Sequence, residues 1–373
     1  MKFTIKRELL LNALVKVSKA ISTKNLIPVL AGIKFELKKK KLILTASDNN
    51  ITIQTMIEAS DEFQIENEGS IIIQGKYILD IVRKLPDEYI NVEVIDDLKI
   101  VVYTENSEFN LNGISESEYP NINLEESKKK IDISSNVFKS IIFQTAFASS
   151  NEESKPVLTG INFNIVGDIL ECNSTDSYRL ARKVVKLNKE SEDNYNIVIP
   201  SHNLIEFTKI LSSEEENIEL HIFNNKILFK TDNVKFESRL INGTYPNTSN
   251  LLPDDSMLVI STNLSDFYNV IDRVSILTSD KEKNIVTLET NGDTLILKSS
   301  SAEIGHVEEK MKINKNNDEN IKISFSAKYM MEALKSFSTE NVDLHFVGEI
   351  KPILIKSQED ETLTQLVLPI RTY

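Results

Sequence analysis

The sequence predicts an α+β protein in which one module occurs three times, each copy with two helices packed on antiparallel sheets. Its 373 residues exceed what one compact core of ordinary size needs. A Tyr-Pro-Asn turn occurs twice, and its tyrosines, Tyr119 and Tyr245, lie 126 residues apart. This period is far longer than the roughly 20 to 50 residues of solenoids and propellers, so each copy is expected to be a domain.

Each module reads as two similar halves. The first half is a strand that enters a helix, in "FTIKRELLLNALVKVSKAI", "IDISSNVFKSIIFQTAFAS" and "LVISTNLSDFYNVIDRVSIL". The second half is a strand, a helix and further strands, and it begins at "IIIQGKYILDIV", "NIVIPSHNLIEF" and "IKISFSAKYMME". We therefore expect domains at 1–128, 129–256 and 257–373. Each Tyr-Pro-Asn is expected to end a module's sheet, because proline cannot continue a strand ladder.

Six segments are predicted to be helices, and each carries an apolar stripe at helical spacing. Such stripes are expected to belong to the core rather than to a ligand site. The segments are 7–20, 76–85, 135–148, 201–211, 264–277 and 327–337, and the stripes are Leu10, Ala13, Leu14 and Val17; Ile78, Ile81, Val82 and Leu85; Val137, Phe138, Ile141 and Ile142; Leu204, Phe207, Thr208 and Leu211; Leu264, Phe267, Tyr268 and Ile271; and Met330, Ala333, Leu334 and Phe337.

Composition indicates an ordinary globular protein, with 40% hydrophobic and 27% charged residues. No apolar run is long enough to span a bilayer, and "MKFTIKRELL" lacks the apolar core of a signal peptide, so a cytoplasmic location is expected. Cys172 is the single cysteine, which excludes an intramolecular disulfide and favours a small buried apolar role.

The net charge of −13 argues at first against a nucleic-acid partner. The six helix segments nevertheless total +5, which leaves −18 for the rest of the chain. Helix propensity alone does not explain this sorting, because glutamate forms helices as readily as lysine. A cationic lining inside an acidic body would attract a polyanion without gripping it. The "KKKK" run at 38–41 is instead expected to be a solvated hairpin turn.

Several motifs resemble one family. They are the opening "MKFTIKRELLLNALVKVSKAI", "STDSYRLA" at 174–181, "SRLINGTYPN" at 238–247, "LLP" at 251–253 and the final "LVLPIRTY". In this order they resemble the bacterial sliding clamps, the beta subunits of replicative DNA polymerase III. The resemblance implies a homodimer closed head to tail into a ring, with helices around a central hole that holds duplex DNA. It also implies a processivity factor without catalytic activity or cofactor, in which neighbouring sheets continue one another.

The resemblance further implies three sets of functional residues. A pocket between the second and third domains is expected to take short apolar peptides from the replicative polymerase, the clamp loader and repair polymerases. Tyr178 stands where the family often has histidine, Ser177 where glycine is common, and Thr372 and Tyr373 extend the chain past the last arginine, which leaves the peptide preference open. The pocket residues are Leu158, Thr175, Ser177, Tyr178, Arg179, Leu180, Pro246, Leu251, Leu366, Val367, Leu368, Pro369, Ile370 and Arg371; the DNA-facing residues are Lys24, Arg83, Lys139, Lys155, Lys209 and Arg273; and the dimer-interface residues are Phe109, Leu111, Ile276 and Leu277.

Two other classes of function were weighed. Paired carboxylates can serve glycoside hydrolysis, but Asp48 and Asp176 occupy equivalent places in "TASDNN" and "NSTDSY", which favours a structural turn role. The four histidines, His202, His221, His306 and His345, show no metal-ligand spacing, and no nucleophile elbow, phosphate loop or dinucleotide fingerprint occurs. A scaffold that binds only proteins would share the pocket but would not need the charge sorting.

Overall fold

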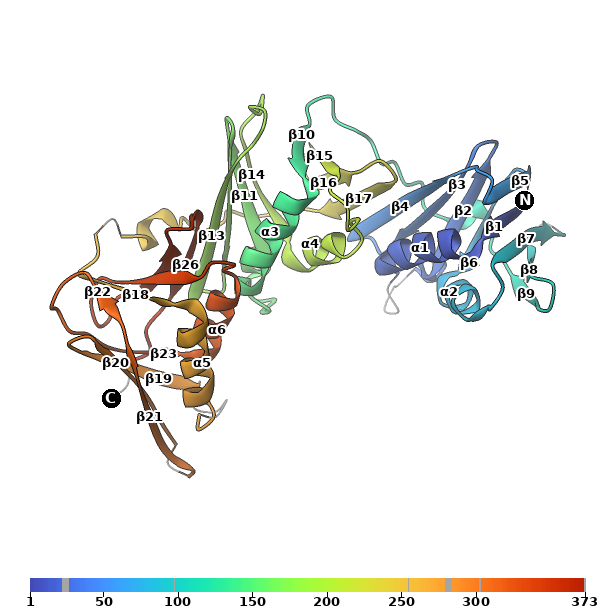
Figure 1. The fold of residues 1–373 in the computed structure, drawn as a ribbon. Helices are drawn as coiled ribbons and strands as arrows, with labels where there is room; N and C mark the ends of the chain where they lie inside the picture. The colour runs from blue at the N-terminus through green and yellow to red at the C-terminus, as the bar shows by residue number, and fades with distance from the viewer. Residues whose placement is uncertain (22–26, 97, 254, 279–283, 302, 372–373) are drawn as a thin grey trace. The chain divides into compact units, whose positions relative to one another are not determined.

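The computed structural model describes residues 1–371 except 22–26, 97, 254, 279–283 and 302 (Figure 1). The chain forms two compact units. The first unit consists of Met1–Asn136 and Glu206–Leu240, and the second of Val137–Ile205 and Ile241–Tyr373. Among the described residues no helix is both long and apolar enough to cross a membrane.

The first unit contains two antiparallel sheets. The five-stranded sheet has the order β5-β1-β7-β8-β9, and the eight-stranded sheet has the order β10-β15-β16-β17-β4-β3-β2-β6. The bounds are β1 (Lys2–Lys6), β2 (Gly32–Lys38), β3 (Lys41–Ser47), β4 (Ile51–Glu58), β5 (Phe63–Asn67), β6 (Gly69–Gln74), β7 (Tyr89–Ile95), β8 (Lys99–Tyr103), β9 (Glu108–Asn112), β10 (Ile131–Ser134), β15 (Asn217–Ile222), β16 (Lys226–Lys230) and β17 (Val234–Arg239).

The second unit also contains two antiparallel sheets. Their orders are β14-β11-β12-β13-β26-β25-β24-β18-β22 and β21-β20-β19-β23. The bounds are β11 (Gly160–Val166), β12 (Ile169–Thr175), β13 (Arg179–Lys186), β14 (Tyr195–Pro200), β18 (Leu258–Asn263), β19 (Ile285–Asn291), β20 (Thr294–Ser301), β21 (Gly305–Lys312), β22 (Asn314–Lys315), β23 (Lys322–Ser326), β24 (Asn341–Phe346), β25 (Ile353–Ser357) and β26 (Asp360–Val367).

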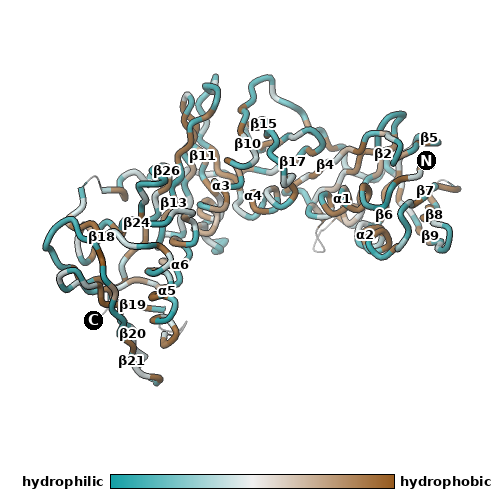
Figure 2. Tube along the Cα trace, viewed as in Figure 1, coloured by the Kyte–Doolittle hydropathy of each residue, from teal (hydrophilic) through white to brown (hydrophobic). Residues whose placement is uncertain are grey.

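All six predicted helices are present, and each buries at least two of the four residues of its predicted stripe. Figure 2 shows apolar and polar residues alternating along α1 and α5, as expected of helices with one buried face. The observed helices are up to three residues shorter at their carboxyl ends, because the last turns of two of them tighten into 3-10 helices at Ser18–Ala20 and Ala146–Ala148. The bounds are α1 (Arg7–Val17), α2 (Gly75–Lys84), α3 (Ser135–Thr145), α4 (Ser201–Thr208), α5 (Leu264–Ser275) and α6 (Ala327–Lys335).

The prediction that Val137 belongs to the core is wrong. Val137 is exposed, whereas Phe138, Ile141 and Ile142 are buried. Successive helical residues are rotated by about 100°, so Val137 lies well away from the direction that Phe138 and Ile142 share. The lysine run behaves as predicted, because Lys38 ends β2 and Lys41 begins β3, with an exposed turn between them.

The middle repeat is divided between the two units because its sheets continue those of its neighbours. In the first unit β17 pairs with β4, with Phe236 opposite Ile53. In the second unit β13 pairs with β26, with Leu180 opposite Leu366. These pairings confirm that neighbouring modules continue one another's sheets, which leaves fewer strand edges exposed.

The tyrosines of the two Tyr-Pro-Asn turns are buried in small apolar clusters. Tyr119 packs with Leu30 and Ile72, and Tyr245 packs with Leu158 and Val198. Burial raises the pKa of both hydroxyls. The Tyr245 hydroxyl accepts a hydrogen bond of 3.0 Å from the backbone N–H of Thr175. The repetition therefore reflects an apolar contact made by tyrosine. The expectation that the Tyr-Pro-Asn turns end the sheets is wrong, because β9 and β17 already end at Asn112 and Arg239, ahead of Pro120 and Pro246.

Candidate functional site

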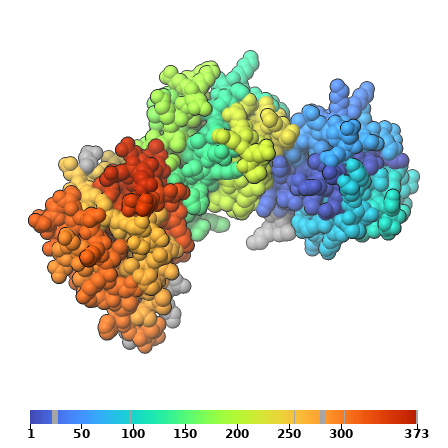
Figure 3. All heavy atoms as spheres, in the orientation of Figure 1, coloured from blue at the N-terminus to red at the C-terminus, as the bar shows by residue number. Residues whose placement is uncertain are grey.

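A surface cavity of about 650 Å³ lies in the second unit. Tyr178 borders it from the turn before β13, Lys328 and Tyr329 from the first turn of α6, and Leu368–Arg371 from the segment after β26. In Figure 3 the deep-red surface marks the chain around β26, the strand that precedes this segment. The cavity thus brings together five of the predicted pocket residues: Tyr178, Leu368, Pro369, Ile370 and Arg371.

A tight turn presents Tyr178 to the cavity. The Asp176 carboxylate accepts hydrogen bonds from the backbone N–H groups of Tyr178 and Arg179, at 2.9 and 3.1 Å. Ser177 has a φ of 79°, in the left-handed region that costs a residue with a Cβ about 1–2 kcal/mol. Its N–H donates to the Thr175 hydroxyl at 3.1 Å, which helps to hold this conformation. The conformation explains why glycine suits this position.

The same turn recurs in the first unit. The Asp48 carboxylate accepts N–H groups from Asn50 and Ile51 at 2.9 and 2.8 Å, and Asn49 has a φ of 74°. In both aspartates one carboxylate oxygen therefore accepts hydrogen bonds from the neighbouring backbone, as expected of a residue with a structural role in a turn.

Arg179 contacts the pocket wall from behind and does not line the cavity. Only 9% of it is exposed. Its guanidinium pairs with Asp176 at 2.9 Å and with Glu332, and it donates to the Phe147 carbonyl at 2.6 Å. It also lies over the Tyr329 ring, 4.5 Å from the centroid. Arg179 thus joins β13 to α6.

An apolar floor supports the terminal segment. Leu180, Leu354 and Leu366 form a buried cluster, against which Leu368 packs. The Leu368 N–H donates to the Tyr178 carbonyl at 2.9 Å, and the Ile370 N–H donates to the Ser324 carbonyl at 2.7 Å. These bonds hold the terminal segment against the Tyr178 turn and β23. Thr372 and Tyr373 are outside the described residues.

The other predicted pocket residues do not line the cavity. Leu158 is buried beside Tyr245, whereas Pro246 and Leu251 are exposed on the segment that follows. Sequence reasoning missed Asn284, Ser326, Lys328 and Tyr329, which do line it. The available signal was Tyr329, an aromatic residue directly before the core stripe of a predicted helix. It stacks on Tyr178 with 6.4 Å between centroids.

The predicted DNA-facing residues are distributed over both units. Arg83 lies 3.5 Å from Asp80 within α2, and Lys209 lies 2.5 Å from Glu206. Arg273, at the end of α5, makes a two-point ion pair with Glu309 of β21 at 2.9 and 2.7 Å. Lys139 is half-buried on α3, Lys155 is exposed before the 3-10 helix Pro156–Thr159, and Lys24 falls outside the described residues.

The predicted dimer residues lie on an edge strand and directly after a helix. Phe109 and Leu111 belong to β9, an edge strand of the five-stranded sheet. Ile276 and Leu277 directly follow α5, and Ile276 is 72% exposed. β21 is one of the two edge strands of the four-stranded sheet in the second unit.

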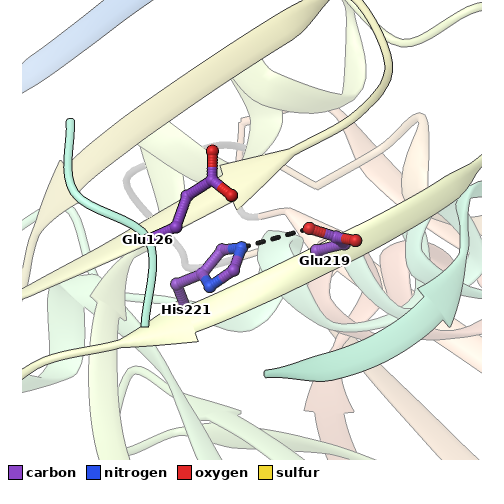
Figure 4. A group of neighbouring side chains, drawn as sticks. All are labelled: Glu126, Glu219 and His221. Atoms are coloured by element: carbon purple, nitrogen blue, oxygen red, sulfur yellow. Dashed lines mark hydrogen bonds and ion pairs between the residues drawn. The ribbon is translucent and has the colours of Figure 1, made fainter. Parts of the chain in front are cut away.

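A cluster of Glu126, Glu219 and His221 was not foreseen (Figure 4). Their potential ligand atoms all lie within 4.8 Å of one another. Lys230 and Lys235 form ion pairs with the Glu126 carboxylate at 2.8 and 2.7 Å, and Lys130 forms an ion pair with Glu219. A divalent ion would have to displace these ammonium groups, so we assign no metal here. The only signal in the sequence was the Glu-x-His spacing on one strand face.

Fold and cavity together define a class: a three-module α+β protein whose modules share continuous sheets and which has a surface cavity with an apolar floor. Family models of the DNA polymerase III beta subunit match nearly the whole chain, with the N-terminal domain at residues 1–123, the central domain at 132–247 and the C-terminal domain at 249–371. The chain belongs to the DNA polymerase III beta subunit family.

Full-length relatives agree with this assignment. A beta sliding clamp of Staphylococcus epidermidis is 39% identical over 377 aligned positions that cover all of both chains. The crystal structure of the DNA polymerase sliding clamp from Bacillus subtilis is 38% identical with a TM-score of 0.96, and that of the DNA polymerase III beta chain from Streptococcus pneumoniae is 32% identical with a TM-score of 0.94. Both comparisons cover each chain completely.

Proposed function

We propose that this chain is a replication sliding clamp, a homodimeric ring that encircles duplex DNA and tethers polymerases to it. The observation that carries the proposal is the match of three consecutive family domains along one chain, with full-length sliding clamps as relatives. The module limits 1–128, 129–256 and 257–373 are part of the proposal, and the extents of the family models support them. In this role the protein acts in the cytoplasm and catalyses no reaction.

The charges support a loose contact with DNA. The six helix segments are net cationic in a chain of net charge −13. Lys209 and Arg273 also share their charge with carboxylates of their own chain, so phosphate must compete with these partners. Weak, sequence-independent contacts of this kind hold a polyanion without stopping its movement.

The two sheet edges support closure into a dimer. β9 and β21 are both edge strands, and β9 carries the apolar side chains of Phe109 and Leu111. An edge strand with unpaired backbone groups invites pairing with another chain. Head-to-tail pairing of β9 with β21 of a second copy would remove both edges.

The cavity beside Tyr178 supports the tethering role. It is bordered by two aromatic rings and the apolar segment Leu368–Ile370, and its floor is apolar. A short extended peptide with apolar side chains fits such a surface. Polymerases, the clamp loader and repair polymerases are the proposed sources of that peptide.

Retention on circular DNA tests the proposal. Labelled protein is loaded on nicked circles by a clamp loader and ATP, and the fraction bound at moderate salt is measured before and after the circle is cut. Topological linkage predicts rapid loss after cutting. Equal retention on circles and linear DNA would contradict the encircling mechanism.

Charge reversal separates a clamp from a protein-only scaffold. Changing Lys139, Lys209 and Arg273 to glutamate should weaken loading or retention of the clamp, whereas a scaffold would be unaffected. Changing Lys38, Lys39 and Lys40 to glutamate is the matched control, since it makes the same charge change at the β2–β3 hairpin. If both variants lose loading and retention to a similar degree, the cationic helix residues have no special role in holding DNA.

A further inference from the structure

A nearly buried carboxylate lies between two cations of the helix segments. Glu206, on α4, is only 9% exposed, whereas Lys19 and Lys209 are both exposed. One Glu206 carboxylate oxygen lies 2.5 Å from the Lys209 ammonium, and the other lies 3.4 Å from the Lys19 ammonium. All three residues belong to the first unit. Lys209 is one of the proposed DNA-facing residues, and Lys19 lies near the end of the cationic segment 7–20.

The charge of Glu206 depends on these two lysines. Burial raises the pKa of Glu206, but hydrogen bonds from Lys209 and Lys19 and their positive charges outweigh burial, so its pKa lies below the ordinary value. Removing the cationic partner of a buried carboxylate is strongly destabilising. Glu206 therefore holds the two ammonium groups more firmly than an acid on the open surface does, where an ion pair contributes little.

A structural tie accounts for only part of this arrangement. Lys19 comes from the first module and Glu206 from the second, so their ion pair joins two modules. Lys209 follows Glu206 by three residues, and its ion pair joins no second element. Lysine side chains are common ligands of DNA phosphates. The Glu206 carboxylate thus lies between two ammonium groups, in the kind of place that a phosphate oxygen would take.

We propose that Glu206 is an internal competitor of DNA phosphate, which keeps Lys19 and Lys209 from holding the DNA backbone tightly. The inference rests on the proposed encircling function and adds to it a residue that sets the strength of phosphate contact. Glu206 acts through the lysines and does not itself contact DNA. A phosphate can bind either lysine only by displacing it from a nearly buried carboxylate, so the contact is weak and the protein stays free to slide.

The test removes the competing charge. Glu206→Gln keeps the size of the side chain, and Glu206→Met is a second uncharged variant, because apolar residues of similar volume often replace buried charges without loss of stability. Affinity for short linear duplex DNA is measured by fluorescence polarisation over a range of salt concentrations. The slope of log affinity against log salt should steepen by about 0.9 for each lysine that gains a phosphate. Single-molecule tracking of loaded protein should show slower diffusion along DNA.

Three further variants separate competition from other effects. Glu215→Gln is the matched control, because Glu215 is an exposed acid of the same unit and the substitution removes the same charge. Glu206→Asp retains the carboxylate and should keep the wild-type slope. Adding Lys19→Gln and Lys209→Gln to Glu206→Gln should return the slope to the wild-type value, because the released lysines are then absent.

A steeper slope in Glu206→Gln or Glu206→Met, absent from Glu215→Gln and reversed when both lysines are replaced, supports the proposal. A wild-type slope in both uncharged variants overturns it, and a loss of stability in urea unfolding would then assign Glu206 to the tie between modules alone. Release of loaded wild type from cut circles is measured in parallel. If cutting still releases it, only the competitor role is overturned, whereas equal retention on circular and linear DNA overturns the encircling function and the competitor role with it.

Discussion

Ser177 shows how one residue sets the direction of a functional side chain. Its φ of 79° turns the chain so that Tyr178 is 60% exposed beside the cavity. Asp176 and the Thr175 hydroxyl both bond the backbone of this turn. The left-handed conformation is therefore stabilised by the two residues that precede it, and the turn tolerates a small residue with a Cβ.

Replacing Ser177 with valine should disturb this turn. A β-branched side chain is strongly disfavoured at positive φ, so we expect a loss of about 1–3 kcal/mol in the free energy of unfolding and weaker peptide binding. Ser177→Gly should retain both properties, because glycine adopts this conformation freely. Urea unfolding and peptide titration measure the two effects. Unchanged binding by the valine variant would show that the turn does not position Tyr178.

At the scale of elements, Arg179 connects strand β13 to helix α6. Removing the charge of one partner, in Glu332→Gln, leaves a nearly buried guanidinium with only Asp176 as its acidic partner. We expect a destabilisation of about 1–3 kcal/mol in urea unfolding. Glu349→Gln, an exposed acid in the same unit, should change stability little. A loss of the same size in both variants would argue against the connecting role.

Ion pairs hold the segment between β9 and β10 against strands β16 and β17. Lys230 and Lys235 lower the pKa of Glu126 from its ordinary value of 4.5 to about 2. Because the folded-state pKa is depressed, this interaction stabilises the fold above about pH 4.5 and is lost as the pH falls towards 2. The stability difference between wild type and Glu126→Gln should therefore shrink over that range. A difference that stays constant from pH 6 to 2.5 would contradict this.

Predictability from sequence differs between these scales. The helices and the tripled module follow from apolar spacing, which is local and repeated. Val137 was misplaced because it lies about 100° around the helix from Phe138, outside the buried face, and apolar spacing alone does not show where that face ends. The roles of Arg179 and of the Glu126–Glu219–His221 cluster depend on contacts between distant segments, 153 residues apart for Arg179 and Glu332. No local pattern encodes such pairs.

At the scale of the whole molecule, continuity of the sheets decides where edges remain. Pairing of β17 with β4 and of β13 with β26 joins the modules within each unit. Edge strands β9 and β21 belong to the first and third modules. A chain that joins its modules in this way and leaves its outer modules with open edges is suited to assembly with further copies of itself.

Assembly is best tested at Ile276. It is 72% exposed directly after α5, and burial of such a side chain in a dimer interface would contribute about 1.5–3 kcal/mol. Ile276→Asp should therefore shift the protein from dimer towards monomer in sedimentation velocity and reduce its retention on circular DNA. Ile350→Asp is the matched control, since Ile350 is 65% exposed but lies in the loop between β24 and β25. If Ile276→Asp sediments as wild type does while Ile350→Asp dissociates, the proposed interface is in the wrong place, because the apolar side chain that assembly buries would then belong to that loop.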